Sequence, residues 1–118
     1  MVLKRVFEKY NSWEHGVNKS EMDKMRFQKV MRDCELLDEQ AGGLSGQEVG
    51  KIFGRCKPGS RTALNFFSFM EGLRHVAVRK RLSLNEVMER IVLVGGPVDS
   101  RQDSARVAHL QMPTSLVT

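Results

Sequence analysis

The residues of this sequence best suited to chemistry are its two cysteines and three histidines, and none stands in a recognised pattern. Cys34 and Cys56 lie far apart, without the C-x-x-C spacing of a structural zinc site or a redox motif. His15, His75 and His109 are isolated and have no cysteine or carboxylate at a standard ligand spacing. We therefore expect reduced, packed thiols and no metal site.

Sequence patterns typical of enzymes are also missing. The chain has no P-loop, no G-x-S-x-G and no H-E-x-x-H, and the glycines between positions 42 and 50 match no phosphate-binding fingerprint. The sequence predicts a protein that is not an enzyme and needs no cofactor.

Two stretches resemble the loops of paired EF-hands, which bind calcium through oxygen ligands at fixed positions. In the first, Gly42, Leu44 and Glu48 match the glycine, the inward aliphatic residue and the closing acid of such a loop. The first, third and fifth positions would then be Leu37, Glu39 and Ala41, so only one of the three offers a side-chain oxygen.

A second loop, aligned on Leu64, is less suited still to calcium. Its ligand positions would be Lys57, Gly59, Arg61 and Ser68. Because two of these side chains are cations, they would repel a metal ion. We expect an EF-hand-like scaffold whose loops are degenerate and do not bind calcium.

Positive charge gathers in one part of the sequence. Residues 51–81 hold eight basic side chains and a single acid, Glu71, whereas the rest of the chain is nearly balanced. Such a surface suits an acidic partner, although a solvated face is the alternative. The residues that we predict to contact a partner are Arg55, Lys57, Arg61, Arg74, Arg79, Lys80 and Arg81. Arg74, Arg79, Lys80 and Arg81 could also stabilise the C-terminal end of the fourth predicted helix. We expect a variant with reversed charges at Arg79, Lys80 and Arg81 to lose binding while staying folded.

The spacing of apolar residues predicts about five helices that would position these side chains. The first covers residues 2–14 and the second runs from a cap at Ser20 to about Leu37, with Met25 inward and Phe27 outside the apolar stripe. Capping residues predict the start of the other three at Ser45, Asn65 and Ser83. Residues 62–64 could pair briefly as a strand, and the fifth helix is expected to turn Val87, Ile91 and Val92 inward before Gly95 stops it.

The length and the apolar content suit one all-α domain, which we place at residues 1–96, followed by a flexible C-terminal tail at 97–118. No apolar stretch reaches the length of a membrane span. The first ten residues carry four charges, whereas a secretory signal needs an uninterrupted apolar region. We therefore expect a cytosolic protein without a membrane partner.

The segment EMDKMRFQKVMRDCELLD, from Glu21 to Asp38, resembles the core signature of the tubulin polymerization-promoting protein family. A hydrophobic helix, a basic turn and an F-x-x-F pair at Phe66 and Phe69 follow at compatible spacing, and the similarity covers most of residues 5–96. Within the signature we expect Asp33 to cap a helix or brace the core, and Cys34 to pack in it.

The resemblance implies a non-catalytic protein that binds tubulin and promotes the polymerisation, bundling or stabilisation of microtubules. It also implies a cytoplasmic, cytoskeletal location, with short members of the family associated with cilia or flagella. Zinc binding in the family raises the question whether Cys34, Cys56 and His75 converge in space. The sequence does not decide whether the chain self-associates.

Two other functions fit parts of the sequence. A pI near 9.6 suits nucleic acid, although no reader motif appears and we favour nucleic acid less. A helical adaptor with a Met-rich cleft is the second alternative, with ordinary Met packing in the core as the simpler interpretation.

Overall fold

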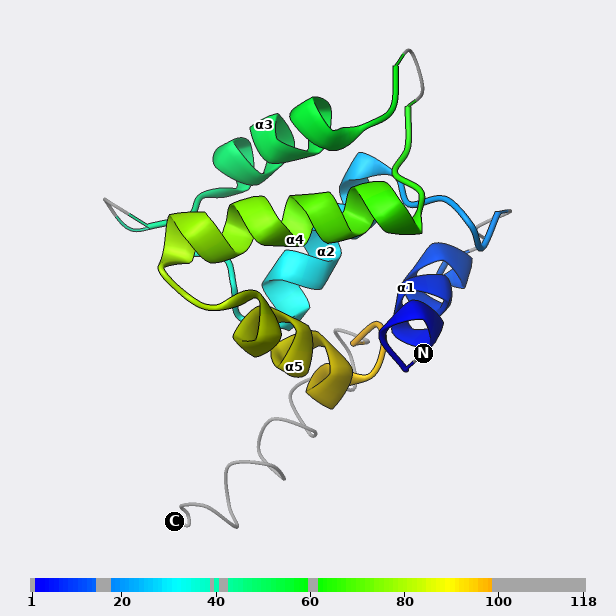
Figure 1. Cartoon of the computed structure of the whole chain (residues 1–118). Coiled ribbons are helices and arrows are strands. Elements are labelled where there is room, and N and C mark those ends of the chain that lie inside the picture. The colour runs from blue at the N-terminus through cyan, green and yellow to red at the C-terminus, as the bar shows by residue number, and fades with distance from the viewer. Residues whose placement is uncertain (1, 15–17, 39, 41–42, 60–61, 99–118) are drawn as a thin grey trace, which may run out of the picture.

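The computed structural model describes residues 2–14, 18–38, 40, 43–59 and 62–98. Within these ranges the chain forms five helices and no strand, so the predicted all-α fold is confirmed (Figure 1). The helices are α1 (Val2–Ser12), α2 (Lys24–Asp33), α3 (Gly46–Cys56), α4 (Phe66–Lys80) and α5 (Leu84–Val94). None of these described helices is both long and apolar enough to cross a bilayer.

Side-chain caps begin the last three helices at the predicted residues. Ser45 and Ser83 each form a complete capping box, with Glu48 and Glu86 respectively. The Asn65 side chain accepts a hydrogen bond from the backbone amide of Ser68 at 2.8 Å. Because each cap satisfies a donor that the first helical turn leaves unpaired, these starts are encoded locally.

The start of α2 was predicted wrongly at Ser20, because a long-range contact takes precedence over the local signal. Met22 and Leu64 exchange two backbone hydrogen bonds of 2.7 Å in an isolated antiparallel bridge. Since this pairing keeps Met22 extended, the helix begins only at Lys24, with Asp23 as its cap. Of the brief strand pairing expected at residues 62–64, only this bridge at Leu64 forms among the described residues.

The end of α2 also differs from the expectation, since the helix stops at Asp33 rather than near Leu37. Glu35 adopts a left-handed conformation with φ of 58°. The amide of Leu36 then bonds back to the Met31 carbonyl at 2.8 Å, and the Leu36 side chain becomes fully buried. Burial of that leucine stabilises a turn that the helical pattern does not reveal.

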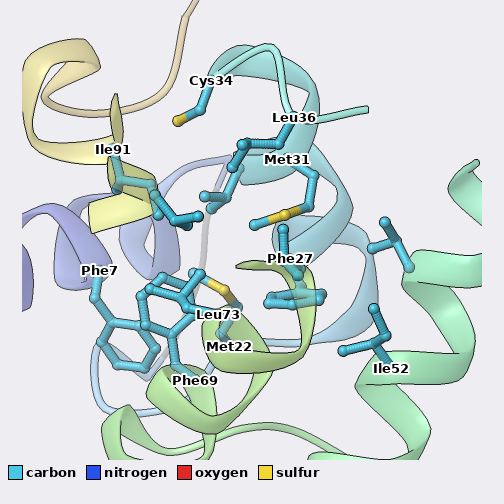
Figure 2. Packing of buried hydrophobic residues seen from close by; sticks show 14 of the residues in the cluster. Phe7, Met22, Phe27, Met31, Cys34, Leu36, Ile52, Phe69, Leu73 and Ile91 are labelled. Atoms are coloured by element: carbon cyan, nitrogen blue, oxygen red, sulfur yellow. The ribbon is translucent and has the colours of Figure 1, made fainter. Parts of the chain in front are cut away.

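The core lies where four helices meet around α2 (Figure 2). Phe27, which falls outside the predicted stripe, is fully buried between Phe53 and Phe69, with ring centroids 6.1 and 6.2 Å away. Met25 and Val92, expected to point inward, are 53% and 36% exposed. The rotation of each helix is set by neighbours on both sides, which a single helical period cannot predict.

Most of the methionines considered for a cleft pack in or against the core, and Met25 is the exception, at 53% exposed. Met22 and Met31 are fully buried in the core, and Met70 and Met88 pack against its edge. The simpler interpretation of these residues, ordinary core packing, is therefore the one that the structure supports.

Glu48, which the first EF-hand alignment treats as the closing calcium ligand, has another use. Its side chain accepts from the Ser45 amide in the capping box and pairs with Arg79 at 2.9 Å. Leu37, the proposed first ligand position, packs against the hydrophobic core. Gly42 of that alignment lies outside the described residues, and the EF-hand-like interpretation stays a prediction.

A buried polar cluster joins α1, α2 and the segment after α5. The Asp33 carboxylate accepts hydrogen bonds from the Tyr10 hydroxyl at 2.9 Å and from the Val98 amide at 3.0 Å. The ammonium of Lys29 donates to Asp33 at 3.2 Å and to the Val98 carbonyl at 2.8 Å. Asp33 thus braces the core as expected, and the backbone of residue 98 is held at both its donor and its acceptor.

The boundary predicted after residue 96 stays a prediction. Residues 97 and 98 are packed against the helices, and the remainder of the expected tail, residues 99–118, lies outside the described residues.

Candidate functional site

An open groove of about 650 Å³ runs between α3 and α4, and we call it the α3/α4 groove. Figure 1 shows the two helices side by side along most of their length. The lining residues from α3 are Glu48, Lys51, Ile52 and Arg55. Those from α4 are Glu71, Arg74, His75, Val78 and Arg79.

The sequence produces this groove by turning one face of each helix toward the core. Val49, Ile52 and Phe53 are the buried residues of α3, so its charged residues fall on the outer face. In α4 the buried residues include Phe69, Leu73 and Val76, so the charged residues of this helix also fall on the outer face. Ile52 remains as an apolar floor, and Val78, 80% exposed, adds apolar surface at the rim.

Two ion pairs neutralise the carboxylates of the groove. Arg79 binds Glu48 at 2.9 Å and donates to the Gly43 carbonyl at 2.8 Å, so it ties α4 to the start of α3. Arg74 binds Glu71 at 3.0 Å within α4. The hydrogen bonds from Arg79 lower the pKa of Glu48, and those to Glu48 raise the pKa of Arg79.

Positive charge remains once these pairs are formed. Lys51 and Arg55 are exposed and have no ion-pair partner among the described residues. They stand four residues apart on α3, which brings their side chains to the same face about 5–6 Å apart at Cβ. The groove is therefore a cationic surface with an apolar floor.

The two carboxylates of the groove are not placed to act as general acids. A general acid needs a raised pKa near neutrality, whereas that of Glu48 is lowered and both carboxylates are paired with arginine. No group of three or more His, Cys, Asp or Glu side chains that could hold a metal occurs in the described ranges.

The three residues considered for zinc do not gather in one place. Cys34 is buried in the core, where burial and the nearby Asp33 raise its pKa to about 12. Burial, followed by Glu71, raises the pKa of Cys56, which is half-buried at the end of α3. His75 is exposed on α4. The two thiols thus have different surroundings, and both are protonated near neutral pH.

The structure brings together only part of the predicted contact set. Arg55, Arg74 and Arg79 line the groove, whereas Lys57, Lys80 and Arg81 do not. Lys57 caps the C-terminal end of α3, Arg81 caps α4, and Lys80 lies in the last turn of α4. Arg61 lies outside the described residues. Lys51 also lines the groove and was not predicted, although its spacing from Arg55 could have indicated it.

Arg79 has a structural role that the sequence did not reveal. Its contacts join residues more than thirty positions apart. A variant with reversed charges at Arg79, Lys80 and Arg81 should therefore be less stable than expected from the sequence, because a carboxylate at position 79 would face and repel that of Glu48.

Comparison with known proteins places this helical domain in a family. A family model described as p25-alpha matches residues 4–111, which is most of the chain and extends past residue 96. This is the domain of the tubulin polymerization-promoting protein family, so the resemblance found in the sequence is confirmed. No curated protein matches the chain.

Proposed function

Because the chain belongs to the p25-alpha family, we propose that it is a microtubule-associated protein that binds tubulin and promotes the polymerisation, bundling or stabilisation of microtubules. It acts without catalysis, in the cytoplasm and on the cytoskeleton, including that of a cilium or flagellum. Family membership is the observation that carries this proposal.

The α3/α4 groove supplies the contact with tubulin in this proposal. Tubulin exposes acidic C-terminal tails, and the cations of the groove are complementary to them in charge. Lys51, Arg55 and Arg74 are the residues in direct contact. Lys57, Lys80 and Arg81 add to the field that attracts the tail, with a strength that falls as salt rises.

Co-sedimentation with stabilised microtubules tests the proposal. At about 150 mM salt, where exposed charge contacts are heavily screened, we expect the chain to pellet with microtubules and to resist competition by duplex DNA. A Lys51→Glu, Arg55→Glu variant should bind about tenfold more weakly.

A matched control separates the groove from net charge. Lys4 and Arg32 are exposed and lie outside the groove, so Lys4→Glu, Arg32→Glu changes the charge of the chain equally. This variant should pellet like the unmodified chain. Absence of pelleting, or its loss to DNA, would contradict the proposal and support a nucleic-acid module or an adaptor. Equal loss in both variants would show that net charge alone acts.

A further inference from the structure

A second cationic hollow lies on α1, and its lining residues include none of those in the α3/α4 groove. It has a volume of about 600 Å³. We call it the α1 hollow and define it by Arg5, Glu8, Lys9, Trp13, Lys19 and Pro97. Figure 1 shows α1 and α3 on different sides of α4.

The α1 hollow is held in shape by contacts beneath its surface. The Val98 amide donates a hydrogen bond to Asp33, and the Val98 carbonyl accepts one from Lys29. These two hydrogen bonds fix Pro97 beside α1. Asn11, 1% exposed, donates to the Lys19 carbonyl at 2.7 Å and so fixes the wall on the other side.

The glycine before Pro97 lets the C-terminal segment approach α1 closely. Gly96 has φ of 156°, and a Cβ at this position would lie 3.3 Å from Cδ of Lys9. The aliphatic part of Lys9 therefore rests against the glycine, and Lys9 is one of the residues that line the hollow. The same Lys29 that clasps Val98 lies 4.7 Å from the centroid of the Trp13 ring. Residues distant in sequence thus form one prearranged surface.

The charge pattern of the hollow repeats that of the groove. Arg5 and Lys9 stand four residues apart on α1, as Lys51 and Arg55 do on α3. Lys19 adds a third cation to the hollow beside the single carboxylate of Glu8, and α4 adds Arg74 and Arg79 to the groove. Same-face pairs of this kind are about 5–6 Å apart at Cβ. In an extended peptide, side chains two residues apart point to the same side and are about 6.6 Å apart. The two glutamates of a Glu-x-Glu segment therefore have a spacing similar to that of Arg5 and Lys9, or of Lys51 and Arg55.

We propose that the α1 hollow is a second binding site for an extended acidic peptide segment, so that one chain holds two such segments at once. Trp13 and Pro97 provide the apolar surface against which the peptide backbone and its intervening side chains lie. If the proposed function holds, this bivalency lets a single chain bridge two microtubules; the bridging rests on that function, whereas the second site does not.

Intrinsic fluorescence tests the second site directly, because Trp13 is the only tryptophan of the chain and lines the hollow. The probe is a synthetic peptide with glutamates at alternate positions, titrated into the full chain, with a glutamine version as control. We expect a saturable change in tryptophan emission and, by calorimetry, two peptides bound per chain.

Two variants assign the sites. Arg5→Glu, Lys19→Glu should weaken the fluorescence response about tenfold and reduce the stoichiometry to one. Lys51→Glu, Arg55→Glu should also reduce the stoichiometry to one but leave the fluorescence response intact. The Lys4→Glu, Arg32→Glu variant should change neither. No saturable tryptophan response to the glutamate peptide, a tryptophan response that survives Arg5→Glu, Lys19→Glu, or a response to duplex DNA but not to the peptide would overturn the second site. A stoichiometry of one with the tryptophan response intact would instead reject peptide binding by the α3/α4 groove.

Bundling then separates this inference from the proposed function. Each double variant should still pellet with microtubules through its remaining site, although more weakly than the unmodified chain, and should fail to bundle them in electron micrographs. Failure of the unmodified chain to pellet would reject the proposed function and, with it, the bridging, while the peptide titration would still decide the second site. Pelleting with full bundling by Arg5→Glu, Lys19→Glu would reject the bridging alone.

Discussion

The same chemistry, a lysine or arginine beside a carboxylate, appears in two regions of this molecule with opposite consequences. In the cluster of Tyr10, Lys29, Asp33 and Val98, the two charged side chains are only 11% and 6% exposed. In the α3/α4 groove the Arg74–Glu71 pair is 60% and 44% exposed. Burial turns the first pair into a structural clasp, and exposure leaves the second available to a partner.

Burial has this effect because it changes what surrounds a charge. Removing one member of a buried pair leaves the other in a medium that cannot solvate it, whereas water replaces a lost partner at the surface. The two regions should therefore respond to mutation by very different amounts.

The largest effect is expected at Asp33. Asp33→Ala removes the acceptor of Tyr10 and Val98 and leaves Lys29 buried without its carboxylate, which should lower the free energy of unfolding by about 3–5 kcal/mol. Urea unfolding followed by circular dichroism measures this loss. A Lys29→Met, Asp33→Asn double variant should lose less, because no charge is left behind. A loss below about 1 kcal/mol for Asp33→Ala would show that the clasp behaves like a surface pair.

Alkaline pH should weaken the buried region next. Burial, followed by the charge of Asp33, raises the pKa of Cys34 to about 12, and burial raises that of Tyr10 above its usual range. Unfolded thiols ionise near pH 9, so between that value and about 12 the unfolded state releases a proton that the folded state keeps.

Stability should therefore be constant below about pH 8 and fall by about 1 kcal/mol between pH 9 and 10 for the thiol alone. Urea titrations at a series of pH values measure the slope. Because a serine hydroxyl does not titrate in this range, Cys34→Ser should reduce the slope even if it lowers stability overall. A flat profile to pH 10 in the unmodified chain would contradict the assignment.

Within the groove itself, Arg79 and Arg74 should differ. Arg79→Ala breaks contacts with Glu48 and with the Gly43 carbonyl, so we expect a lower melting temperature, by less than for Asp33→Ala. Arg74→Ala should change stability by no more than about 0.5 kcal/mol, since its pair is exposed. Melting at low and high salt should show a salt-dependent loss for Arg79→Ala. Equal losses for the two variants would remove the distinction between them.

The smallest effect, a gain, is expected at the end of α4. Arg81 caps this helix in a left-handed conformation, with φ of 58°. Because glycine adopts this conformation without steric strain, Arg81→Gly should raise stability by about 0.5–1 kcal/mol. Thermal unfolding measures it, with Lys80→Gly as the control that should destabilise, since Lys80 is within the helix. A loss at Arg81 would show that its side chain holds the structure together.

The positions of most helices could be predicted because their signals are local. Ser45, Asn65 and Ser83 begin their helices with hydrogen bonds to residues three positions ahead, and Gly95 ends α5 in a left-handed conformation. These interactions are decided by the chain within one helical turn. The family membership was equally accessible, since the signature from Glu21 to Asp38 carries it.

The candidate sites were only partly predictable. A charge count over residues 51–81 located the basic segment of the chain, but it did not reveal that Arg79 forms an ion pair with Glu48. The cations of the α1 hollow lie in a part of the sequence whose net charge is nearly balanced, so a sum over residues conceals them. Only contacts beneath the surface bring Lys9, Lys19 and Pro97 together.

By itself, then, the sequence determined the five helices of the described ranges, most of their capped ends, the family and the sign of the surface charge. The tertiary structure alone decided which charges are paired, that Asp33 and Lys29 clasp residue 98, and that two separate cationic surfaces result. The physical reason is range: caps and turns act over a few bonds, whereas burial and ion pairing depend on which distant segments exclude water from one another.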